Sequence, residues 1–348
     1  MNGKKLLTGI TPLYQRIISL FPRDISLTFA YGSAVYPQKQ ESVKQPAKNN
    51  VIDLIFVVPN AFLWHEENLK LNPKHYSSLR YLGYRSLARI QETYGAGVYY
   101  NTLIPFEDIT FKYGIVSESS LISDLLDWNY LYLAGRLHKP VLKLYSTDNI
   151  RLKNALELNL HSAMHAALLM LPEAFTESEL YQTIANLSYN GDFRMIFGED
   201  KNKVANIVEN QLELFRELYN PVVNFMKDYM EISNIEGTMI GAQDPSPHAK
   251  MYHLNQLPRT PQRIIVQQWN RSGRRKLDAE DILAFVAHDV DPESAVERAL
   301  RHIVWSSSVR QSIKGIFTAG ILKSVRYSMA KVRKMLLSKS PKKDAIPP

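Results

Sequence analysis

The chain has 348 residues, enough for two domains of ordinary size, and 45% hydrophobic with 22% charged residues is typical of a globular protein. It contains no cysteine, which excludes disulfides and thiolate metal sites and indicates an intracellular compartment. No apolar run reaches the ~18 to 20 residues that cross a bilayer, so no membrane span is expected. The formal charge of +8 is uneven: residues 307–348 hold ten Lys or Arg and one acid, and residues 1–306 carry −1. A near-neutral body argues against a general nucleic-acid-binding groove.

Two short apolar runs, Leu27–Tyr31 and Val51–Val58, predict a pair of buried strands separated by a polar loop. Gly32 follows the first run and allows the backbone to approach a ligand closely, and Ser33 offers a hydroxyl and an N–H to an anion. Asp53 is the only charged residue of the second run. A buried carboxylate normally pairs with a cation or binds a metal, so this stretch predicts an anion and metal site.

The next segments predict further strands and a helix. The runs at 98–104 and 109–116 predict strands, and Lys112 lies in the middle of the second one. A lysine there is either an edge residue that faces water or a cation aimed at phosphates. Apolar residues at helical spacing predict a helix over Leu121–Leu133, for which Gly135 would supply the C-terminal cap. A last strand at 141–144 closes the first domain near residue 150.

Helical periodicity dominates from residue 154 to 233, and it is interrupted by a cluster of charged residues. Asp192, Arg194, Glu199 and Lys203 form either a solvated turn or a site that presents a carboxylate to a metal and a guanidinium to phosphate. Residues 234–260 contain three prolines and are predicted to form a loop, and a smaller helical module is expected to follow, up to residue 306.

The C-terminal segment carries an apolar residue at every third or fourth position from Ile313 to Leu336, and its other positions are rich in Lys and Arg. A basic amphipathic helix without acids is typical of membrane-surface segments. Two other interpretations are a helix docked on the body and an arm that binds nucleic acid. The membrane interpretation is preferred, with Lys323, Arg326 and Arg333 among the residues that would meet anionic lipid phosphates.

Several short motifs, in chain order, resemble one known family. They are Tyr31-Gly-Ser33, the strand around Asp53, Trp64-His65, His75-Tyr-Ser77, Tyr94-Gly-Ala-Gly-Val-Tyr-Tyr100, Lys112-Tyr-Gly114, Leu133-Ala-Gly-Arg-Leu-His-Lys-Pro140, Gly191-Asp-Phe-Arg-Met195 and Gly315-Ile-Phe-Thr-Ala-Gly320. Together they resemble the mitochondrial-type CDP-diacylglycerol synthases, the phosphatidate cytidylyltransferases of the translocator-assembly-and-maintenance family. The match covers nearly the whole chain.

The resemblance implies transfer of CMP from CTP to phosphatidic acid, with Mg²⁺, to give CDP-diacylglycerol and pyrophosphate for cardiolipin synthesis. It implies an α+β fold: a polymerase-β-like nucleotidyltransferase domain (1–150), a helical, winged-helix-like domain (151–306) and a basic membrane-binding tail (307–348). It also implies a peripheral protein on the matrix face of the mitochondrial inner membrane, or on the cytoplasmic face of the cell membrane in a bacterial host. Nucleic acid is not an expected partner.

The resemblance assigns roles to the residues already singled out. Gly32 and Ser33, with Tyr31, would hold the β- and γ-phosphates, and Asp53 would position Mg²⁺. Lys112, with Arg194 or Lys203, would offset charge on the transferred phosphate.

One position departs from the wider polymerase-like pattern, because Ile55 stands where a second aspartate is common. A two-metal site therefore needs another carboxylate, and the candidates in order of preference are Asp192, Glu199, Asp108 and Glu66. Two other functions are compatible with these residues: a nucleotidyltransferase whose acceptor is RNA, a small molecule or a protein, and a non-catalytic membrane adaptor.

Overall fold

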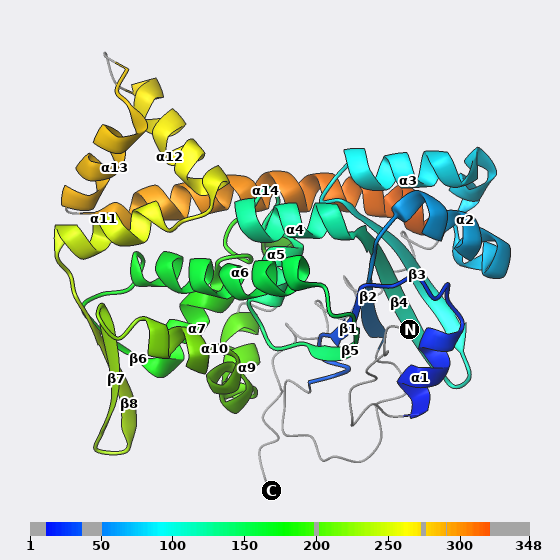
Figure 1. Ribbon diagram of the computed structural model, residues 1–348, viewed down its shortest axis with the longest axis horizontal. Helices are drawn as coiled ribbons and strands as arrows, with labels where there is room; N and C mark the ends of the chain where they lie inside the picture. The colour runs from blue at the N-terminus through cyan, green and yellow to red at the C-terminus, as the bar shows by residue number, and fades with distance from the viewer. Residues whose placement is uncertain (1–11, 37–50, 198–201, 273–275, 290, 321–348) are drawn as a thin grey trace, which may run out of the picture.

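The computed structural model describes residues 12–36, 51–197, 202–272, 276–289 and 291–320. Over these residues the chain forms a mixed α+β fold, which confirms the predicted class (Figure 1). A five-stranded sheet lies in one half of the molecule, and a mainly helical half with a small three-stranded sheet lies in the other. None of the described helices is long and apolar enough to cross a membrane.

The large sheet is mixed and has the strand order β3-β4-β2-β1-β5. Strands β2 and β4 are parallel, and every other neighbouring pair is antiparallel. The strands are β1 (Leu27–Tyr31), β2 (Ile52–Val58), β3 (Val98–Phe106), β4 (Ile109–Ser117) and β5 (Leu142–Ser146). The predicted strand pair on either side of Gly32 is confirmed, and the two strands are direct neighbours.

Both faces of this sheet are covered, because its side chains alternate between two hydrophobic clusters. Ile55 and Val57 belong to one cluster, and Leu54 and Phe56 belong to the other. The face of Leu54 is packed against α1 (Pro12–Ser19), α2 (Ala61–Leu71), α3 (Gly83–Thr93) and the short helices η1 (Pro73–His75) and η2 (Ser78–Leu82). The face of Ile55 is packed against α4 (Glu118–Asp127), α5 (Leu133–Leu137) and α6 (Ile150–Leu168). The cluster on the Ile55 face continues into the helical half, so the two halves share one core.

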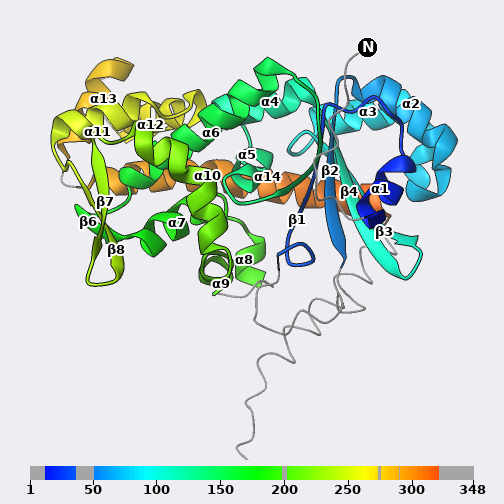
Figure 2. The same ribbon diagram turned by 60° about the horizontal axis from the view of Figure 1, so that its bottom comes forward.

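The helical half contains a small antiparallel sheet with the order β6-β8-β7. Its strands are β6 (Ala174–Thr176), β7 (Met230–Ile235) and β8 (Thr238–Gln243). Its helices are α7 (Glu177–Asn186), α8 (Arg194–Phe197), α9 (Lys203–Glu209), α10 (Leu212–Phe225), α11 (Pro247–Asn255), α12 (Arg259–Ser272) and α13 (Ala279–His288). Figures 1 and 2 both show the β7–β8 hairpin at the end of the molecule far from the large sheet.

The last described helix, α14 (Pro292–Ala319), runs most of the length of the molecule in both ribbon views (Figure 2). It passes through the predicted domain boundary after residue 306 without a break. Gln311 Nε2 donates to the Val98 carbonyl (3.1 Å), and its Oε1 accepts from the Ala96 N–H (2.9 Å). Lys314 Nζ donates to the Gln91 carbonyl (3.2 Å). Residues 307–319 are therefore docked on the large-sheet half, and residues 321–336 of the predicted tail helix lie outside the described residues.

The predicted helix over Leu121–Leu133 and its predicted glycine cap were both wrong. The single helix predicted over Leu121–Leu133 ends at Asp127, because the Asp124 carboxylate accepts N–H groups of the following turn and Trp128 adopts a positive φ of 52°. Gly135 is not a C-terminal cap but lies within α5. A Cβ at Gly135 would be 2.2 Å from the Ser188 Cβ, so glycine is needed there for close packing.

The predicted loop over residues 234–260 was also wrong, because it contains β8 and α11. The β7–β8 hairpin turns at Glu236 and Gly237, which both have positive φ, as a two-residue type I′ turn requires. Helix α11 begins at Pro247, and the Ser246 hydroxyl caps it by accepting the Ala249 N–H.

Candidate active site

The turn after β1 leaves backbone donors available beside a carboxylate. Gly32 has a φ of +88°, and a Cβ there would lie 3.4 Å from Asp53 Oδ2, so glycine keeps this approach open. The Gly32 carbonyl accepts the N–H groups of Val35 and Tyr36, and Ser33 is exposed. Among the described residues, the Ser33 N–H and hydroxyl donate to no protein acceptor. The turn can therefore offer both groups to an anion.

Asp53 lies opposite a lysine on the neighbouring strand. The strand register pairs Asp53 with Tyr31 on one side and with Lys112 on the other. Lys112 Nζ is 3.3 Å from Asp53 Oδ1 and 4.2 Å from the centre of the Tyr100 ring, and both charged side chains are about 30% exposed. Strand β4 lies between β3 and β2, so Lys112 is not on an edge strand. The interpretation of Lys112 as an edge residue is therefore wrong, and its role as a cation aimed at phosphates stays a prediction.

Arg136 connects the sheet to the helical half, and sequence reasoning missed it. Its guanidinium lies 4.6 Å from the centre of the Tyr31 ring, and Nη2 donates to the Tyr189 hydroxyl at 3.5 Å. Burial alone would lower the pKa of Arg136, but Tyr189, Tyr31 and Asp53 together raise it above its usual value. The guanidinium therefore remains charged at the place where the two halves of the molecule meet.

Further cations surround Tyr189, in the turn after α7. Lys139 Nζ lies 5.0 Å and Lys203 Nζ lies 5.2 Å from the centre of the Tyr189 ring. Burial raises the pKa of the Tyr189 hydroxyl, but Arg136, Lys203 and Arg194 outweigh that effect and the net shift is downward. A tyrosine pKa lowered by cations is the mark of a strongly positive environment, which suits a polyphosphate.

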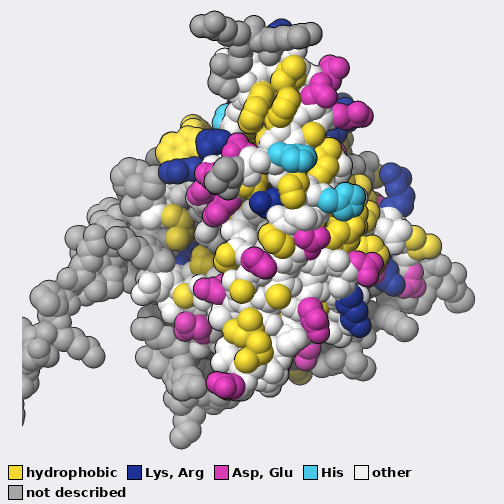
Figure 3. All heavy atoms as spheres, turned by 90° about the vertical axis from the view of Figure 1, so that its left-hand side faces the viewer, with side chains coloured by type: hydrophobic (Ala, Val, Ile, Leu, Met, Phe, Trp, Pro, Cys, Tyr) yellow, Lys and Arg dark blue, Asp and Glu magenta, His cyan; other side chains and the backbone are white. Residues whose placement is uncertain are grey.

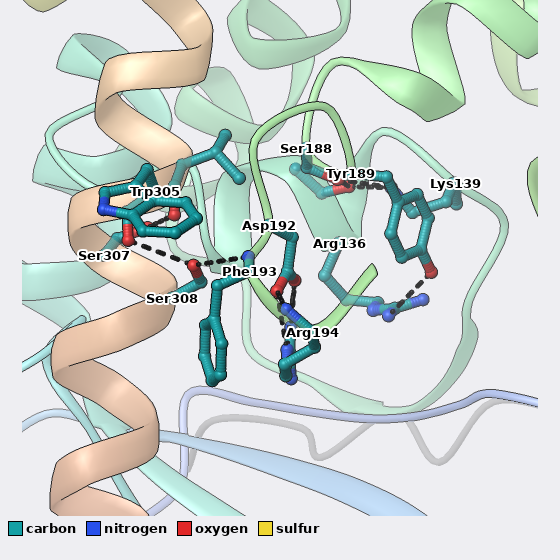
Figure 4. Close-up of polar contacts among 12 residues, drawn as sticks. Arg136, Lys139, Ser188, Tyr189, Asp192, Phe193, Arg194, Trp305, Ser307 and Ser308 are labelled. Carbon is teal, nitrogen blue, oxygen red and sulfur yellow. Dashed lines mark hydrogen bonds and ion pairs between the residues drawn. The ribbon is translucent and has the colours of Figure 1, made fainter. Parts of the chain in front are cut away.

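Lys139 is a second residue that sequence reasoning missed, and it holds the turn of α5 against the turn after α7. Its ammonium donates to the Gly135 carbonyl, to Ser188 Oγ (2.9 Å) and to the Ala185 carbonyl (3.4 Å) (Figure 4). Burial, with Arg136 and Lys203 nearby, lowers the pKa of Lys139 well below its usual value. Since its donors are used by the protein, Lys139 positions Arg136 and Tyr189.

Asp192 and Arg194 form a close ion pair in the same loop. Arg194 Nε lies 2.9 Å from one carboxylate oxygen of Asp192 and 3.0 Å from the other, and the Asp192 side chain is 4% exposed. The loop rests on α14, because the Phe193 N–H donates to Ser308 Oγ (3.4 Å) (Figure 4). Gly191, with a φ of +89°, packs against Arg301 so closely that a Cβ would be 2.7 Å from the Arg301 carbonyl oxygen.

The predicted metal ligands are only partly described. Among the described residues, no three His, Asp or Glu side chains are grouped closely enough to hold a metal ion by themselves. Glu199 lies outside the described residues, and Glu66 lies on α2, over the opposite face of the sheet from Asp53. Ile55 is fully buried on the same face as Asp53, so a carboxylate at that position would enter the core. Asp192 as a second ligand stays a prediction, and it requires Arg194 to move aside.

The residues that sequence reasoning missed carried a weak signal. Arg136 and Lys139 both lie in the segment 133–140, which contributed to the family resemblance, yet the pattern there predicts only the end of an amphipathic helix. Their partners Tyr31 and Tyr189 are distant in the sequence. Only the packing of α5 between the sheet and α7 brings these groups together.

A glycine turn with available donors, one accessible carboxylate and several cations lie beside one face of the mixed sheet, and this arrangement suits a phosphate ligand. Residues 14–334 match the family model described as mitochondrial phosphatidate cytidylyltransferase. Several proteins named mitochondrial phosphatidate cytidylyltransferase are similar over nearly their whole lengths. That of Danio rerio is 49% identical over 92% of this chain and 94% of its own, and that of Xenopus laevis is 46% identical over 96% and 97%. The Drosophila melanogaster protein is 46% identical over 92% of this chain and 98% of its own. The chain belongs to the mitochondrial phosphatidate cytidylyltransferase family.

Proposed function

We propose that this protein is a phosphatidate cytidylyltransferase, which transfers CMP from CTP to phosphatidic acid and releases pyrophosphate. The observation that carries the proposal is the Gly32 turn beside the Asp53–Lys112 pair. It is supported by relatives that bear this name and that are similar to the chain over nearly their whole lengths. A polymerase-β-like nucleotidyltransferase fold for the first half and a winged-helix-like fold for the second are part of the same proposal.

The triphosphate of CTP would lie against the turn after β1. The Ser33 N–H and hydroxyl would donate to phosphate oxygens, and the lack of a Cβ at Gly32 lets the phosphates come close to the backbone. Lys112 and Arg136 lie on the sheet side of this place, and Lys203 and Arg194 lie near Tyr189. Positive charge on both sides would stabilise the transition state, in which charge develops on the transferred phosphate and on the leaving pyrophosphate.

A magnesium ion fits this site if Asp53 supplies one carboxylate ligand. Mg²⁺ is commonly bound by one or two carboxylates, with substrate phosphates and waters as its other ligands. Asp53 is accessible and can supply one such carboxylate, whereas the Asp192 carboxylate is held by Arg194. When bound, the ion would neutralise phosphate charge and orient the triphosphate. Asp53 is the residue that we propose holds it, and Asp192 and Glu199 remain candidates for a further ligand.

The reaction needs little proton chemistry from the protein. An oxygen of the phosphatidate phosphate attacks the α-phosphorus of CTP, and the bond from that phosphorus to the oxygen leaving with pyrophosphate breaks. The attacking phosphate is already ionised, so no strong general base is required. The protein's contribution would be to hold two negatively charged groups in line, and Lys112 and Arg136 lower the repulsion between them.

The substitution Asp53→Asn tests the proposal. It removes the charge without changing the size of the side chain, and we expect CDP-diacylglycerol formation from labelled CTP and phosphatidate to fall at least about a hundredfold. Asp228→Asn, at an exposed site after α10, is the matched control and should leave the rate unchanged. Circular dichroism checks that both variants fold. Wild-type turnover by Asp53→Asn, or transfer of label to RNA in place of phosphatidate, would contradict the proposal.

A membrane location follows from the acyl chains of the substrate. We propose that the protein binds the membrane peripherally, on the matrix face of the mitochondrial inner membrane, where its product would feed cardiolipin synthesis. The basic segment that follows Gly320 would take part, with Lys323, Arg326 and Arg333 near anionic lipid phosphates. These three residues lie outside the described residues.

A further inference from the structure

Exposed apolar side chains gather where the end of α14 meets η2 and the end of α3. On α14, Gln311, Lys314 and Thr318 are buried against the body, and the opposite side of the helix carries large apolar residues. We call the exposed set the η2–α14 surface, and it consists of Tyr81, Leu82, Tyr94, Ile313, Ile316 and Phe317. Tyr81 is the most exposed of them, at 78%.

Two contacts show that these residues form one surface although they are far apart in the sequence. Ser77 Oγ, one residue before η2, donates to the Phe317 carbonyl at 2.9 Å. Lys314 Nζ donates to the carbonyl of Tyr94, which follows α3. These contacts hold the segment before η2, the end of α3 and the end of α14 next to one another, so the exposed apolar residues of the three elements lie on the same part of the protein.

The charge near this surface is mainly positive. Residues 68–91 contain five Lys or Arg and no acid, and Arg310 lies three residues before Ile313. Glu92, two residues before Tyr94, is an acid close to the surface, and it accepts hydrogen bonds from Ser117 and Ser120. Arg80 and Arg85 lie near the rings of Tyr81 and Tyr84, at 4.9 and 5.8 Å from their centres. At the opposite end of the molecule, acidic side chains are spread over the face that carries α11 and the β7–β8 hairpin (Figure 3). The basic character of the η2–α14 surface is therefore local.

We propose that the η2–α14 surface is a docking site for an anionic lipid bilayer, separate from the basic segment that follows it in the chain. Exposed tyrosines and aliphatic side chains next to arginines suit the headgroup region, where aromatic rings insert and cations meet lipid phosphates. The proposal rests on the proposed function, because a substrate with two acyl chains requires the enzyme to meet a bilayer. The surface also includes Gly320, the last described residue, whose added Cβ would be 3.6 Å from Ser77 Cβ. The basic C-terminal segment therefore begins at the same place.

The test uses the full chain and two matched double variants. Leu82→Ser/Phe317→Ser removes two apolar side chains from the surface, and Phe225→Ser/Ile235→Ser removes two of similar exposure from α10 and β7. Binding is measured by co-sedimentation with vesicles of phosphatidylcholine and phosphatidylglycerol, without CTP. We expect the first variant to bind about tenfold more weakly than the wild type and the second to bind as the wild type does. Vesicles of phosphatidylcholine alone should bind all three proteins weakly.

Activity then separates this proposal from the proposed function. With short-chain phosphatidate in detergent micelles, Leu82→Ser/Phe317→Ser should turn over at the wild-type rate, and with phosphatidate in vesicles it should be slower. Equal binding of both variants to anionic vesicles would overturn the proposal that the η2–α14 surface docks on a bilayer. A wild-type dimer that becomes a monomer only in the first variant would assign the surface to a second copy of the chain and also overturn it. Failure of the wild type to use phosphatidate in either form would instead contradict the proposed function.

Discussion

Gly135→Ala tests the closest packing contact between α5 and the turn after α7. The added Cβ would be 2.2 Å from the Ser188 Cβ, where ordinary contacts begin at 3.4 Å, so the two segments must separate by about 1 Å. Overpacking of this kind costs about 1–3 kcal/mol. Replacing a helical glycine by alanine by itself raises the free energy of unfolding by about 0.5–1 kcal/mol. We therefore expect the free energy of unfolding to fall by about 1–2 kcal/mol.

Gly315→Ala is the matched control, because it makes the same substitution in α14 at a position where a Cβ would meet no atom within 4 Å. We expect it to raise the free energy of unfolding by up to about 1 kcal/mol. Urea denaturation followed by tryptophan fluorescence measures both variants. Because Ser188 leads into Tyr189, Gly135→Ala should also lower kcat/KM for CTP. A Gly135→Ala variant as stable and active as the wild type would refute the packing argument.

The remaining predictions concern buried titratable side chains in the helical half. Arg216→Met should lower the free energy of unfolding by about 2 kcal/mol, because the buried Glu177 carboxylate loses the guanidinium that lies 2.6 Å away. The loss is limited because Arg216 itself is partly exposed, so solvent screens the pair. Glu177→Met/Arg216→Met should recover most of the lost stability. Burial lowers the pKa of His165 to about 3 and of His253 to about 4. The unfolded chain, with histidine pKa values near ~6.5, then binds more protons, so urea titrations should show stability falling from about pH 6.5 to pH 4. The stability of His165→Leu/His253→Leu should fall less than that of the wild type over the same pH range. Identical pH profiles of the two proteins would contradict the assignment of this pH dependence to the two histidines.

The parts of the fold that sequence could predict are those set by local pattern. The runs that became β1 and β2 are short, apolar and bounded by turn formers, and burial on both faces of the sheet explains why they are continuous rather than alternating. The hairpin at Glu236 and Gly237 was missed because the prolines that follow it indicated a loop. Its own signal, a glycine in the second position of a tight turn, was present in the sequence.

The site was predictable only where one strand carries the signal. Gly32 and Asp53 are recognisable by their place beside apolar runs, and the structure sets them side by side. The role of Lys112 depends on the order of the strands, because the same residue on an edge strand would face water. Arg136 depends on packing between segments more than fifty residues apart, which no local pattern encodes.

The single span of α14 has a mechanical consequence for the site. Asn190 donates to Glu297, Gly191 lies against Arg301 and Phe193 donates to Ser308, so the Asp192 loop is fastened to the first two thirds of this helix. The next turns fasten the strand that carries Tyr100, through Gln311. A single continuous helix, α14, thus sets the spacing between the Asp192 loop and the large sheet. Widening that gap for a substrate would therefore require α14 to bend.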